Sequence, residues 1–424
     1  MKLIARHLAA PLLKSLSDSR IVNLVGPRQA GKTTLVRDLV KAYRFITLDD
    51  EAELRSLTLD PYGQLRALAD EAKATGLPIV IDEVQRAPGI DLAVKRIVDV
   101  DNRAGQFLLT GSSDVFVQKR SRDSLAGRVD TLTLRPLSAA EISGARPCLL
   151  LDAVAAASGD RVGGLPPPRP MSRPDAIDLM VRGGFPEIRV LQDVARMRRY
   201  ASYVDSIVER DVSPVAEVRK TDALRRMIGQ MASRTGQELN VASLCAALGV
   251  RRETAAAYLD VLVRLGVLHL LGAWAPSRAR REIRAPKLHI MDTGCATALR
   301  GEDRASFGLG TDPVALGAVL ESFIFTEIEK SLPFLSKVWR LHHWRVDRHE
   351  IDLIAEAPGK LLALFETKAS TDVGLNDFRH IMWFRREGPG RSYRTFGFVI
   401  YMGEHVLSFG PGLLALPLSI LWSF

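Results

Sequence analysis

Short apolar runs alternate with amphipathic stretches through about the first 150 residues of the chain. The apolar runs lie near 21–25, 45–48, 78–81, 107–110 and 130–134. The segments between them, such as 61–74 and 92–98, carry apolar residues at helical spacing. Strands that alternate with helices are typical of a parallel sheet covered by helices. The pattern therefore predicts an α/β fold in this part of the chain.

The first apolar run leads directly into Gly26-Pro-Arg-Gln-Ala-Gly-Lys32-Thr33-Thr34. This stretch satisfies G-x-x-x-x-G-K-[ST] between a predicted strand and a predicted helix from Lys32 to about Tyr43, which is the setting the pattern requires. Glycines let successive backbone N–H groups turn toward phosphate oxygens, and the start of the helix adds its positive dipole end. The alternative interpretation is an ordinary loop at a helix N-terminus.

The loop predicts a site for ATP and Mg²⁺. We expect Lys32 to reach the β- and γ-phosphates and the Thr33 hydroxyl to bind Mg²⁺. The expected nucleotide-binding residues are Gly26, Pro27, Arg28, Gln29, Ala30, Gly31, Lys32, Thr33 and Thr34.

A second polar feature follows the apolar run 79–81, where Asp82 and Glu83 come at the carboxyl end of the predicted strand. Ligands of open α/β sheets bind at that edge. We expect Asp82 to hold Mg²⁺ through its water shell and Glu83 to orient and polarise the attacking water. Two acidic residues after a strand are more often a turn or a helix cap, but here they follow the phosphate loop by about 50 residues.

Two further segments are weaker candidates for the same site. The next predicted strand ends in Thr110-Gly111-Ser112-Ser113-Asp114, a polar tip that either senses the γ-phosphate or caps a helix. Arg128, in Ser124-Leu-Ala-Gly127-Arg128, is an arginine suited to neutralising charge during phosphoryl transfer, in its own subunit or across a subunit interface.

The pattern changes after residue 154. Residues 155–175 contain Gly163-Gly164 and five prolines, which predicts an extended linker. Helical patterns at 224–236, 240–248 and 251–266, followed by a β-ribbon, predict a winged helix-turn-helix within 176–300. If that region binds DNA, the groove-facing residues are Arg251, Arg252 and Thr254, and the phosphate contacts on the wing are Arg278, Arg280, Arg281 and Arg284. The alternative is a packing module whose arginines are merely solvated.

Residues 301–424 carry a third group of polar residues. Asp352 lies in one predicted strand and Glu366-Thr-Lys368 in the next, while Glu321 lies on an amphipathic helix near 316–332. This arrangement is typical of restriction-type nucleases, in which Asp352, Glu366 and Glu321 would hold a second divalent cation and Lys368 would steady the attacking water or the phosphate charge. Period-2 geometry places Glu366 and Lys368 on one face of their strand. A solvated face or a salt bridge is the alternative.

Composition limits the class of protein and of partner. Hydrophobic residues make up 47% and charged residues 25% of the 424, as in globular proteins, and the net charge of +9 favours anionic partners weakly. The three cysteines, Cys148, Cys245 and Cys295, have neither disulfide nor metal-ligand spacing, which indicates a reducing, cytoplasmic setting. The apolar run 413–424 is too short to span a membrane and contains Pro417, so we expect a closing strand or docked tail.

Several of these motifs together resemble the prokaryotic AAA-type ATPases that carry a C-terminal domain of unknown function. The resemblance covers most of the chain and implies an ATPase core, a winged-helix region and a restriction-endonuclease-like end. It is carried by Gly26–Leu35, Ile46-Thr-Leu-Asp49-Asp50, Asp60-Pro61, Ile81-Asp-Glu-Val-Gln85-Arg-Ala-Pro88, Leu109–Ser113, Leu125–Arg128, Arg182-Gly-Gly-Phe-Pro-Glu187, Tyr203–Asp211 and Pro286–Gly294.

The sequence as a whole predicts a Mg²⁺-dependent P-loop ATPase domain at 1–154, followed by the linker, the winged-helix region and the nuclease-like domain. Nucleotide turnover would act on a C-terminal module that binds, and in one interpretation cuts, DNA or RNA. The alternative is a nucleotide-controlled switch that binds a protein partner and whose nuclease-like domain is inactive; a small-molecule kinase is a weaker third possibility. Assembly into a homo-oligomer is a further alternative.

Overall fold

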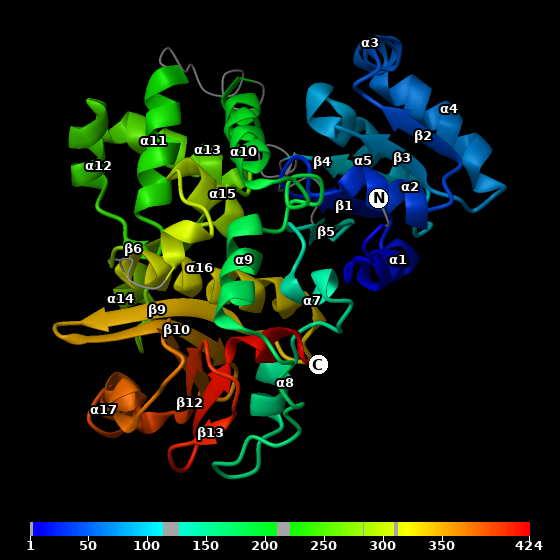
Figure 1. Ribbon diagram of the computed structural model, residues 1–424. Helices are drawn as coiled ribbons and strands as arrows, with labels where there is room; N and C mark the ends of the chain where they lie inside the picture. The colour runs from blue at the N-terminus through cyan, green and yellow to red at the C-terminus, as the bar shows by residue number, and fades with distance from the viewer. Residues whose placement is uncertain (1–2, 113–126, 210–220, 283, 309–312) are drawn as a thin grey trace. The chain divides into compact units, whose positions relative to one another are not determined.

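The computed structural model describes residues 3–112, 127–209, 221–282, 284–308 and 313–424 (Figure 1). The chain divides into two compact units. Unit 1 comprises residues 1–136 with 264–266, and unit 2 comprises residues 137–263 with 267–424. The sequence placed the end of the ATPase domain at residue 154, whereas the chain from Leu137 onward packs with unit 2.

Unit 1 is built on a five-stranded, fully parallel sheet of order β2-β3-β4-β1-β5, which confirms the predicted α/β fold. Its strands are β1 (Ile21–Val25), β2 (Arg44–Thr47), β3 (Ile79–Asp82), β4 (Phe107–Gly111) and β5 (Val129–Thr133). Its helices are α1 (Ala9–Asp18), α2 (Lys32–Leu39), α3 (Glu51–Leu59), α4 (Pro61–Lys73) and α5 (Ile90–Val100).

Strands β1, β3 and β4 of unit 1 are buried along their whole length because both faces of the sheet are covered there. Ile79 and Ile81 of β3 pack into a core with α4 and α5, whereas Val80 between them packs into the opposite core with α1 and α2. Each fully buried aliphatic side chain contributes about 1.5–3 kcal/mol. Burial on both faces therefore explains continuous apolar runs in place of alternation.

Two of the segments that carry the family resemblance begin helices of unit 1. The Asp50 carboxylate accepts hydrogen bonds from the backbone N–H groups of Ala52 and Glu53 and caps α3. Asp60 caps α4 through the N–H of Gly63, and Pro61 stands at the first helical position, where its missing N–H costs nothing. Such caps stabilise a helix by about 1 kcal/mol each.

Unit 2 begins with helices and a small antiparallel sheet of order β6-β8-β7. Its first helices are α7 (Ala139–Ile142), α8 (Leu150–Ala155), α9 (Arg173–Arg182) and α10 (Asp193–Ile207). They are followed by α11 (Thr221–Ser233), β6 (Gln237–Glu238), α12 (Val241–Leu248), α13 (Arg252–Arg264), β7 (Leu268–Leu271), α14 (Arg278–Glu282), β8 (Lys287–Ile290) and α15 (Thr293–Leu299). Residues 278–282, expected on a β-ribbon wing, are helical.

The rest of unit 2 is a six-stranded mixed sheet of order β13-β14-β12-β11-β10-β9. Its strands are β9 (Arg340–Val346), β10 (His349–Ala357), β11 (Leu361–Lys368), β12 (Arg394–Tyr401), β13 (Leu407–Ser408) and β14 (Leu413–Pro417). Helix α16 (Pro313–Ser331) packs on the face that carries Phe365, and α17 (Arg379–Arg386) packs on the face that carries Leu364. Both faces are covered, so β11 is apolar until its end.

Residues 413–424 close this unit, as expected of an apolar tail. After β14 a short 3₁₀ helix, Leu418–Trp422, is buried in the same core as Leu150 and Leu151 of α8. The backbone N–H of Arg146 donates to the carbonyl of Phe424 at 3.2 Å, and the N–H of Arg169 donates to Ser423 Oγ at 2.9 Å. No helix in the described part of the chain is long and apolar enough to cross a membrane.

Candidate functional site

The phosphate loop lies between β1 and α2 and depends on its two glycines. Gly26 has φ +149° and Gly31 has φ +98°, both in the region that favours glycine. A Cβ on Gly26 would stand 2.1 Å from the carbonyl oxygen of Leu134, so no other residue fits there. Gly31 is the left-handed residue from which α2 begins. The loop therefore turns sharply from the sheet into the helix N-terminus.

Lys32 is buried within this loop, with 5% of its surface exposed. Its Nζ donates to the carbonyl oxygens of Gly26 at 2.8 Å and Pro27 at 3.0 Å, which folds the side chain over its own loop. Ala30 is buried as well, Arg28 is half-buried, and Gln29 and Thr34 are exposed. The ammonium thus lies among the loop atoms that the motif directs at phosphates.

A residue that the sequence analysis missed holds the loop from outside. The guanidinium of Arg6 donates to the carbonyl of Ala30 at 2.6 Å and to that of Arg135 at 2.5 Å. Arg6 precedes the first helix and belongs to no motif, so no sequence signal pointed to it. It ties the loop after β1 to the segment after β5.

The residues expected to hold Mg²⁺ meet at the carboxyl edge of the sheet. Thr33 Oγ1 donates to Asp82 Oδ2 at 2.9 Å, and the Thr110 hydroxyl donates to the other oxygen of the same carboxylate. Asp82 is 4% exposed. A hydroxyl and a carboxylate are the oxygen ligands that Mg²⁺ takes in nucleotide sites, so the residues fit the ion. Strand β4 lies between β1 and β3, which explains why Thr110 reaches Asp82.

Glu83 follows Asp82 in a left-handed backbone conformation, φ +59°, that is uncommon for a residue with a side chain. Its carboxylate accepts a hydrogen bond from Gln85 Nε2, which also lies 3.2 Å from Ser112 Oγ. Gln85 was not among the expected site residues, although its position two after Glu83 was visible in the motif. It links the carboxylate of Glu83 to the polar tip of β4.

Arg128 lies away from the phosphate loop. It immediately precedes β5, its backbone carbonyl accepts from the N–H of Ile21 at the start of β1, and its side chain pairs with Asp99. Because β1 and β5 are parallel, Arg128 is at the opposite end of the strands from the loop. The structure does not bring it to the nucleotide site of its own chain. Ser113, Asp114 and residues 124–126 lie outside the described residues.

The four C-terminal candidates occupy the predicted elements, but Asp352 and Lys368 hydrogen-bond or pair with residues outside the expected set. Asp352 Oδ2, on β10, accepts from the N–H and the hydroxyl of Thr367, both at 2.9 Å. Lys368, at the end of β11, pairs with Asp377 at 3.2 Å. No group of three His, Cys, Asp or Glu residues within the described ranges is arranged to hold a metal ion. The second cation site is therefore unsupported.

An unexpected lysine lies among these carboxylates. Lys287 Nζ, on β8, lies 2.6 Å from Glu321 Oε1, 2.8 Å from Glu350 Oε1 and 3.7 Å from Asp352 Oδ1. Its side chain is 2% exposed. The available signal was a lysine at the start of the otherwise apolar run Lys287-Leu-His-Ile-Met291, where a buried charge needs a partner.

The pKa values in this cluster reflect burial and crowding. Burial alone would lower the pKa of Lys287, but the charges of Glu321, Asp352 and Glu350 outweigh it and raise the pKa. Burial raises the pKa of Glu321 to about 8 against the opposing attraction of Lys287. Burial also raises the pKa of Glu366 well above its usual range, and its Oε1 has no hydrogen-bond partner among the described residues.

His343 lies beside this cluster, and we expect it to make unit 2 less stable in acid. Its Nε2 lies 3.1 Å from the carbonyl of Ala285 and its buried Nδ1 has no described partner, so burial, reinforced by Lys287, lowers its pKa from 6.5 to about 4. Because the folded pKa lies below the unfolded one, the unfolded chain takes up the proton first. The stability that depends on an uncharged His343 is fully present above pH 6.5 and is lost as the pH falls through 4.

The raised pKa values of Glu321 and Glu366 act in the opposite direction, so the test compares two proteins. Between pH 7 and 5 the wild type should lose about 1–2 kcal/mol more than His343→Gln. All five tryptophans (274, 339, 344, 383 and 422) belong to unit 2, so urea unfolding followed by tryptophan fluorescence reports on this unit. Equal losses in the two proteins would contradict the assignment.

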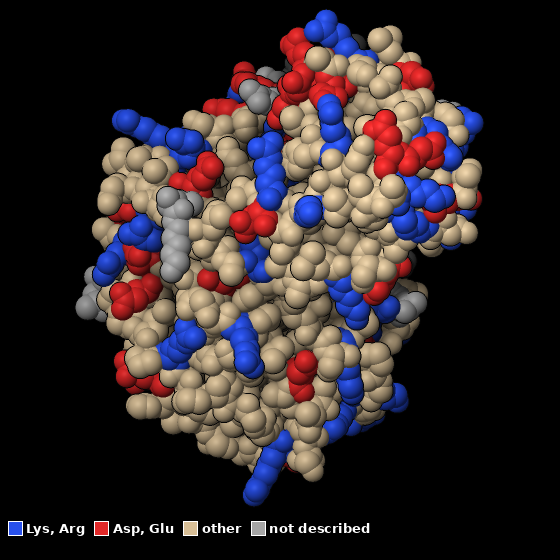
Figure 2. All heavy atoms as spheres, turned by 90° about the vertical axis from the view of Figure 1, so that its right-hand side faces the viewer, with Lys and Arg blue, Asp and Glu red and all other residues tan. Residues whose placement is uncertain are grey.

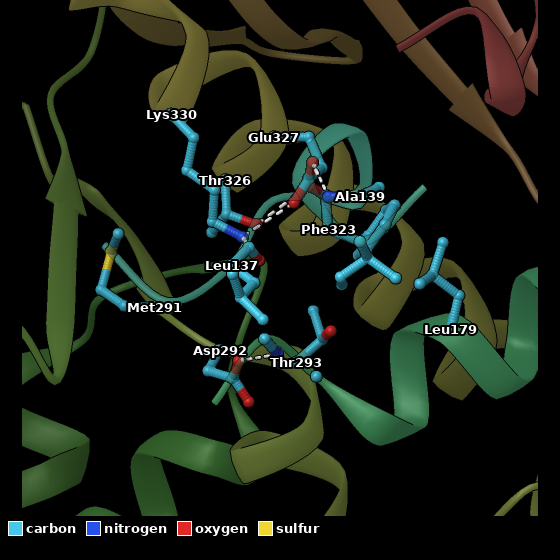
Figure 3. A pocket seen from close by; sticks show the side chains of 13 residues that line it. Leu137, Ala139, Leu179, Met291, Asp292, Thr293, Phe323, Thr326, Glu327 and Lys330 are labelled. Atoms are coloured by element: carbon cyan, nitrogen blue, oxygen red, sulfur yellow. Dashed lines mark hydrogen bonds and ion pairs between the residues drawn. The ribbon is translucent and has the colours of Figure 1, made fainter. Parts of the chain in front are cut away.

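The motifs at 182–187 and 286–294 meet at one buried junction of unit 2 (Figure 3). Asp292 accepts from the N–H of Gly184 at 2.7 Å, the N–H of Cys295 at 2.9 Å and the hydroxyl of Tyr200 at 2.8 Å. Figure 3 shows Asp292 and Thr293 at a small pocket that is also lined by Leu137, which lies just before α7. Each carboxylate oxygen is already used, which gives Asp292 a structural role.

The opposite wall of that pocket is an ion pair on α16. Glu327 accepts from the N–H of Ala139 at 2.7 Å, while Lys330 pairs with Glu327 at 2.7 Å and donates to the carbonyl of Leu137 at 3.1 Å. Figure 3 shows both side chains directed at the segment that leads into α7. These contacts explain why residues from Leu137 onward join unit 2.

Comparison with known proteins gives the family. The uncharacterized protein Rv2008c of Mycobacterium tuberculosis is 31% identical over 361 residues, which cover 84% of this chain and 72% of that protein. The uncharacterized protein Mb2031c of Mycobacterium bovis matches to the same extent. Residues 18–143 match the family model described as an AAA domain, and residues 316–421 match a domain of unknown function, DUF4143. The chain belongs to the AAA-type P-loop ATPases with this C-terminal domain.

Membership in this AAA-type family implies ATP and Mg²⁺ as ligands of unit 1. Residues 173–306 match a second domain of unknown function, DUF8612. Among solved structures, the chain is similar to the Walker-type ATPase PABY2304 of Pyrococcus abyssi, at 15% identity and a TM-score of 0.42 over 70% of this chain and 96% of that one. The Bacillus subtilis DNA clamp loader delta protein matches at 12% identity and a TM-score of 0.26, over 61% and 88% of the two chains.

Proposed function

We propose that this AAA-type protein hydrolyses ATP with Mg²⁺ at the edge of the unit 1 sheet and couples turnover to nucleic-acid binding by unit 2. The single observation that carries the first part is the convergence at one edge of buried Lys32, the Thr33 hydroxyl and the Asp82 carboxylate. A phosphate loop, a cation site and a neighbouring acid are what phosphoryl transfer to water requires.

The residues have separate roles in this mechanism. The backbone N–H groups of residues 28–34 would surround the phosphates, and the Lys32 ammonium would exchange two loop carbonyls for phosphate oxygens. Thr33 and Asp82 would hold Mg²⁺, which supplies charge neutralisation at the phosphates. Glu83, oriented by Gln85, accepts a proton from the attacking water. Arg128 would act only across a subunit interface, which requires an oligomer.

Support for nucleic-acid binding comes from two basic regions of unit 2. An open groove of about 1180 Å³ is lined by Arg252, Arg284 and Arg345. A second groove lies between α17 and the β9–β10 turn and is lined by Arg348, Arg379, Arg386 and Trp383. The Trp383 ring stacks on the ring of His349, with 4.0 Å between the ring centroids. Basic side chains beside aromatic rings suit phosphates and bases. Figure 2, in contrast, shows basic and acidic side chains interspersed on the face it displays.

The order of α11, β6, α12, α13, β7 and β8 supports a winged-helix assignment for this part of unit 2, with Arg251 and Arg252 at the start of α13. Arg281 does not serve it, because its guanidinium makes two hydrogen bonds to Glu356, at 2.7 and 3.0 Å. We place the nuclease-like domain after residue 300 and the protein in the reducing cytoplasm, since its three cysteines are free.

A specific observation favours the second candidate, a nucleotide-controlled switch that binds a protein and cuts nothing. Asp352 is satisfied by Thr367, and Lys368 by Asp377, so the two residues expected to act together in a nuclease hold other partners. The switch differs from the first candidate in unit 2 alone.

ATPase assays with and without DNA or RNA separate the candidates. We expect nucleic acid to bind with an affinity that falls steeply with salt, because phosphate contacts release counterions, and to change the ATPase rate. Arg252→Gln together with Arg345→Gln should lower the salt slope by about 1–2, one for each lost phosphate contact. Arg55→Gln with Arg66→Gln, on α3 and α4, is the matched control. Salt-insensitive binding, or none, would favour the protein-binding switch.

A further inference from the structure

Lys287 joins two parts of unit 2 at the carboxylates where the sequence predicted a divalent cation. It is on β8 of the small sheet, whereas Glu321 is on α16, and Glu350 and Asp352 are on β10 of the large sheet. The Nζ lies 2.6, 2.8 and 3.7 Å from their oxygens. One ammonium thus pairs with three carboxylates from two elements, and carboxylate oxygens are the ligands that a divalent cation takes.

The position of Lys287 is fixed by its surroundings. Strand β8 pairs with both β6 and β7, Lys287 lying opposite Glu238 and Leu271. Two residues on, the ring of His289 contacts Ser322 Oγ of α16 at 3.0 Å, next to Glu321. The strand is therefore docked along α16. Because the Lys287 side chain is itself buried, rotation about its own bonds does not carry the ammonium away from the carboxylates.

A second, independent observation points to the same place. Glu366, with 8% of its surface exposed, precedes Thr367, which bonds to Asp352, yet its Oε1 has no hydrogen-bond partner in the described part of the chain. A further buried oxygen therefore lies beside Asp352, and the described residues supply no donor for it. Lys287 and Glu350 also line the open groove of about 1180 Å³, so ions in solution reach the cluster at Glu350.

We propose that Lys287 takes the place of a divalent cation between Glu321, Glu350 and Asp352, and that its ammonium excludes Mg²⁺ and Mn²⁺ from the C-terminal domain. A metal ion would need to lie within about 2–2.6 Å of the same oxygens, which puts it in contact with the ammonium. The two cations cannot occupy the cluster together, because like charges at that separation repel strongly. The carboxylates of the nuclease-like fold are thus kept, and the metal is replaced by a residue of the chain.

The test is Mn²⁺ binding to the full, nucleotide-free chain, measured from the electron paramagnetic resonance signal of free Mn²⁺. We expect Lys287→Met to bind Mn²⁺ at least about tenfold more tightly than the wild type, and Lys287→Met with Asp352→Asn to lose that gain. Lys337→Met, at an exposed lysine of the same unit, is the matched control and should behave as the wild type. Equal Mn²⁺ binding by wild type and Lys287→Met, or none in either, overturns the proposal.

Folding of the variant is part of the same test. Lys287→Met leaves buried carboxylates without a counterion, so it can unfold in the absence of metal. In that case Mn²⁺ is expected to restore the native tryptophan fluorescence of unit 2 and to raise Tm, because the ion supplies the missing charge. Failure of Mn²⁺ to restore it counts against the proposal. No nucleotide is present, so the outcome is independent of whether unit 1 hydrolyses ATP.

Discussion

Lys32→Ala is expected to lower the ATP turnover rate by about 100-fold or more and to weaken ATP binding, because it removes the buried ammonium from the phosphate loop. Glu83→Gln should behave differently. It keeps the shape of the side chain and its contact with Gln85 but removes the proton acceptor, so ATP binds within about threefold of the wild-type affinity while turnover falls by about 100-fold or more. Binding is measured with a fluorescent ATP analogue and turnover by phosphate release.

The two variants separate ATP binding from ATP hydrolysis, and a control variant accompanies them. Lys41→Ala is the matched control for Lys32→Ala, since Lys41 is an exposed lysine just beyond α2. Its ATPase rate should equal that of the wild type. If Lys32→Ala and Glu83→Gln both hydrolyse ATP at the wild-type rate, unit 1 is not an ATPase of the kind proposed. If Glu83→Gln instead loses ATP binding, Glu83 has a structural role.

Gly183→Ala should destabilise unit 2 by about 3 kcal/mol or more. Gly183 ends α9 with φ +67° and ψ −167°, a conformation essentially restricted to glycine. An added Cβ would stand 2.3 Å from Asp292 Oδ1 and 2.5 Å from the Tyr200 hydroxyl. The substitution therefore combines backbone strain with overpacking of the Asp292 junction. Urea unfolding monitored by tryptophan fluorescence measures the change in unit 2.

Gly317→Ala is the control for that substitution. Gly317 is inside α16, its φ is not positive, and a Cβ there meets nothing within 4 Å. Alanine at that position should leave the unit unchanged or stabilise it by up to about 1 kcal/mol, since glycine is costly in a helix interior. A loss of less than about 1 kcal/mol in Gly183→Ala would show that the junction yields easily.

The N-terminal sheet and its phosphate loop were predictable because their signals are local. Strand, loop and helix start lie within 21–34, and the apolar runs were long enough to identify the five strands. Boundaries were less certain: the helix predicted to reach about Tyr43 ends at Leu39. The motif also placed Thr33 and Asp82, 49 residues apart, on the same edge of the sheet, where they hydrogen-bond.

Contacts between distant elements were out of reach of the sequence. Lys287 precedes Glu321 by 34 residues and comes from a strand assigned to a different domain, so no spacing rule joins it to Asp352. Arg281 was expected on phosphates because it belongs to a run of arginines, but a half-buried acid 75 residues later binds it. Arg6 carried no signal. In each case tertiary packing decides which charge meets which, and local pattern does not.

The closure of unit 2 by residues 413–424 has a consequence for synthesis on the ribosome. Apart from residues 264–266, unit 1 is continuous from 1 to 136 and can fold while later residues are still being made. Unit 2 cannot, since α8 packs in one core with a strand and 3₁₀ helix, and Arg146 hydrogen-bonds to Phe424, all translated more than 250 residues later. Until then the core surfaces of α8, α9 and α16 remain exposed, and nascent chains of this protein are expected to depend on chaperones at that stage.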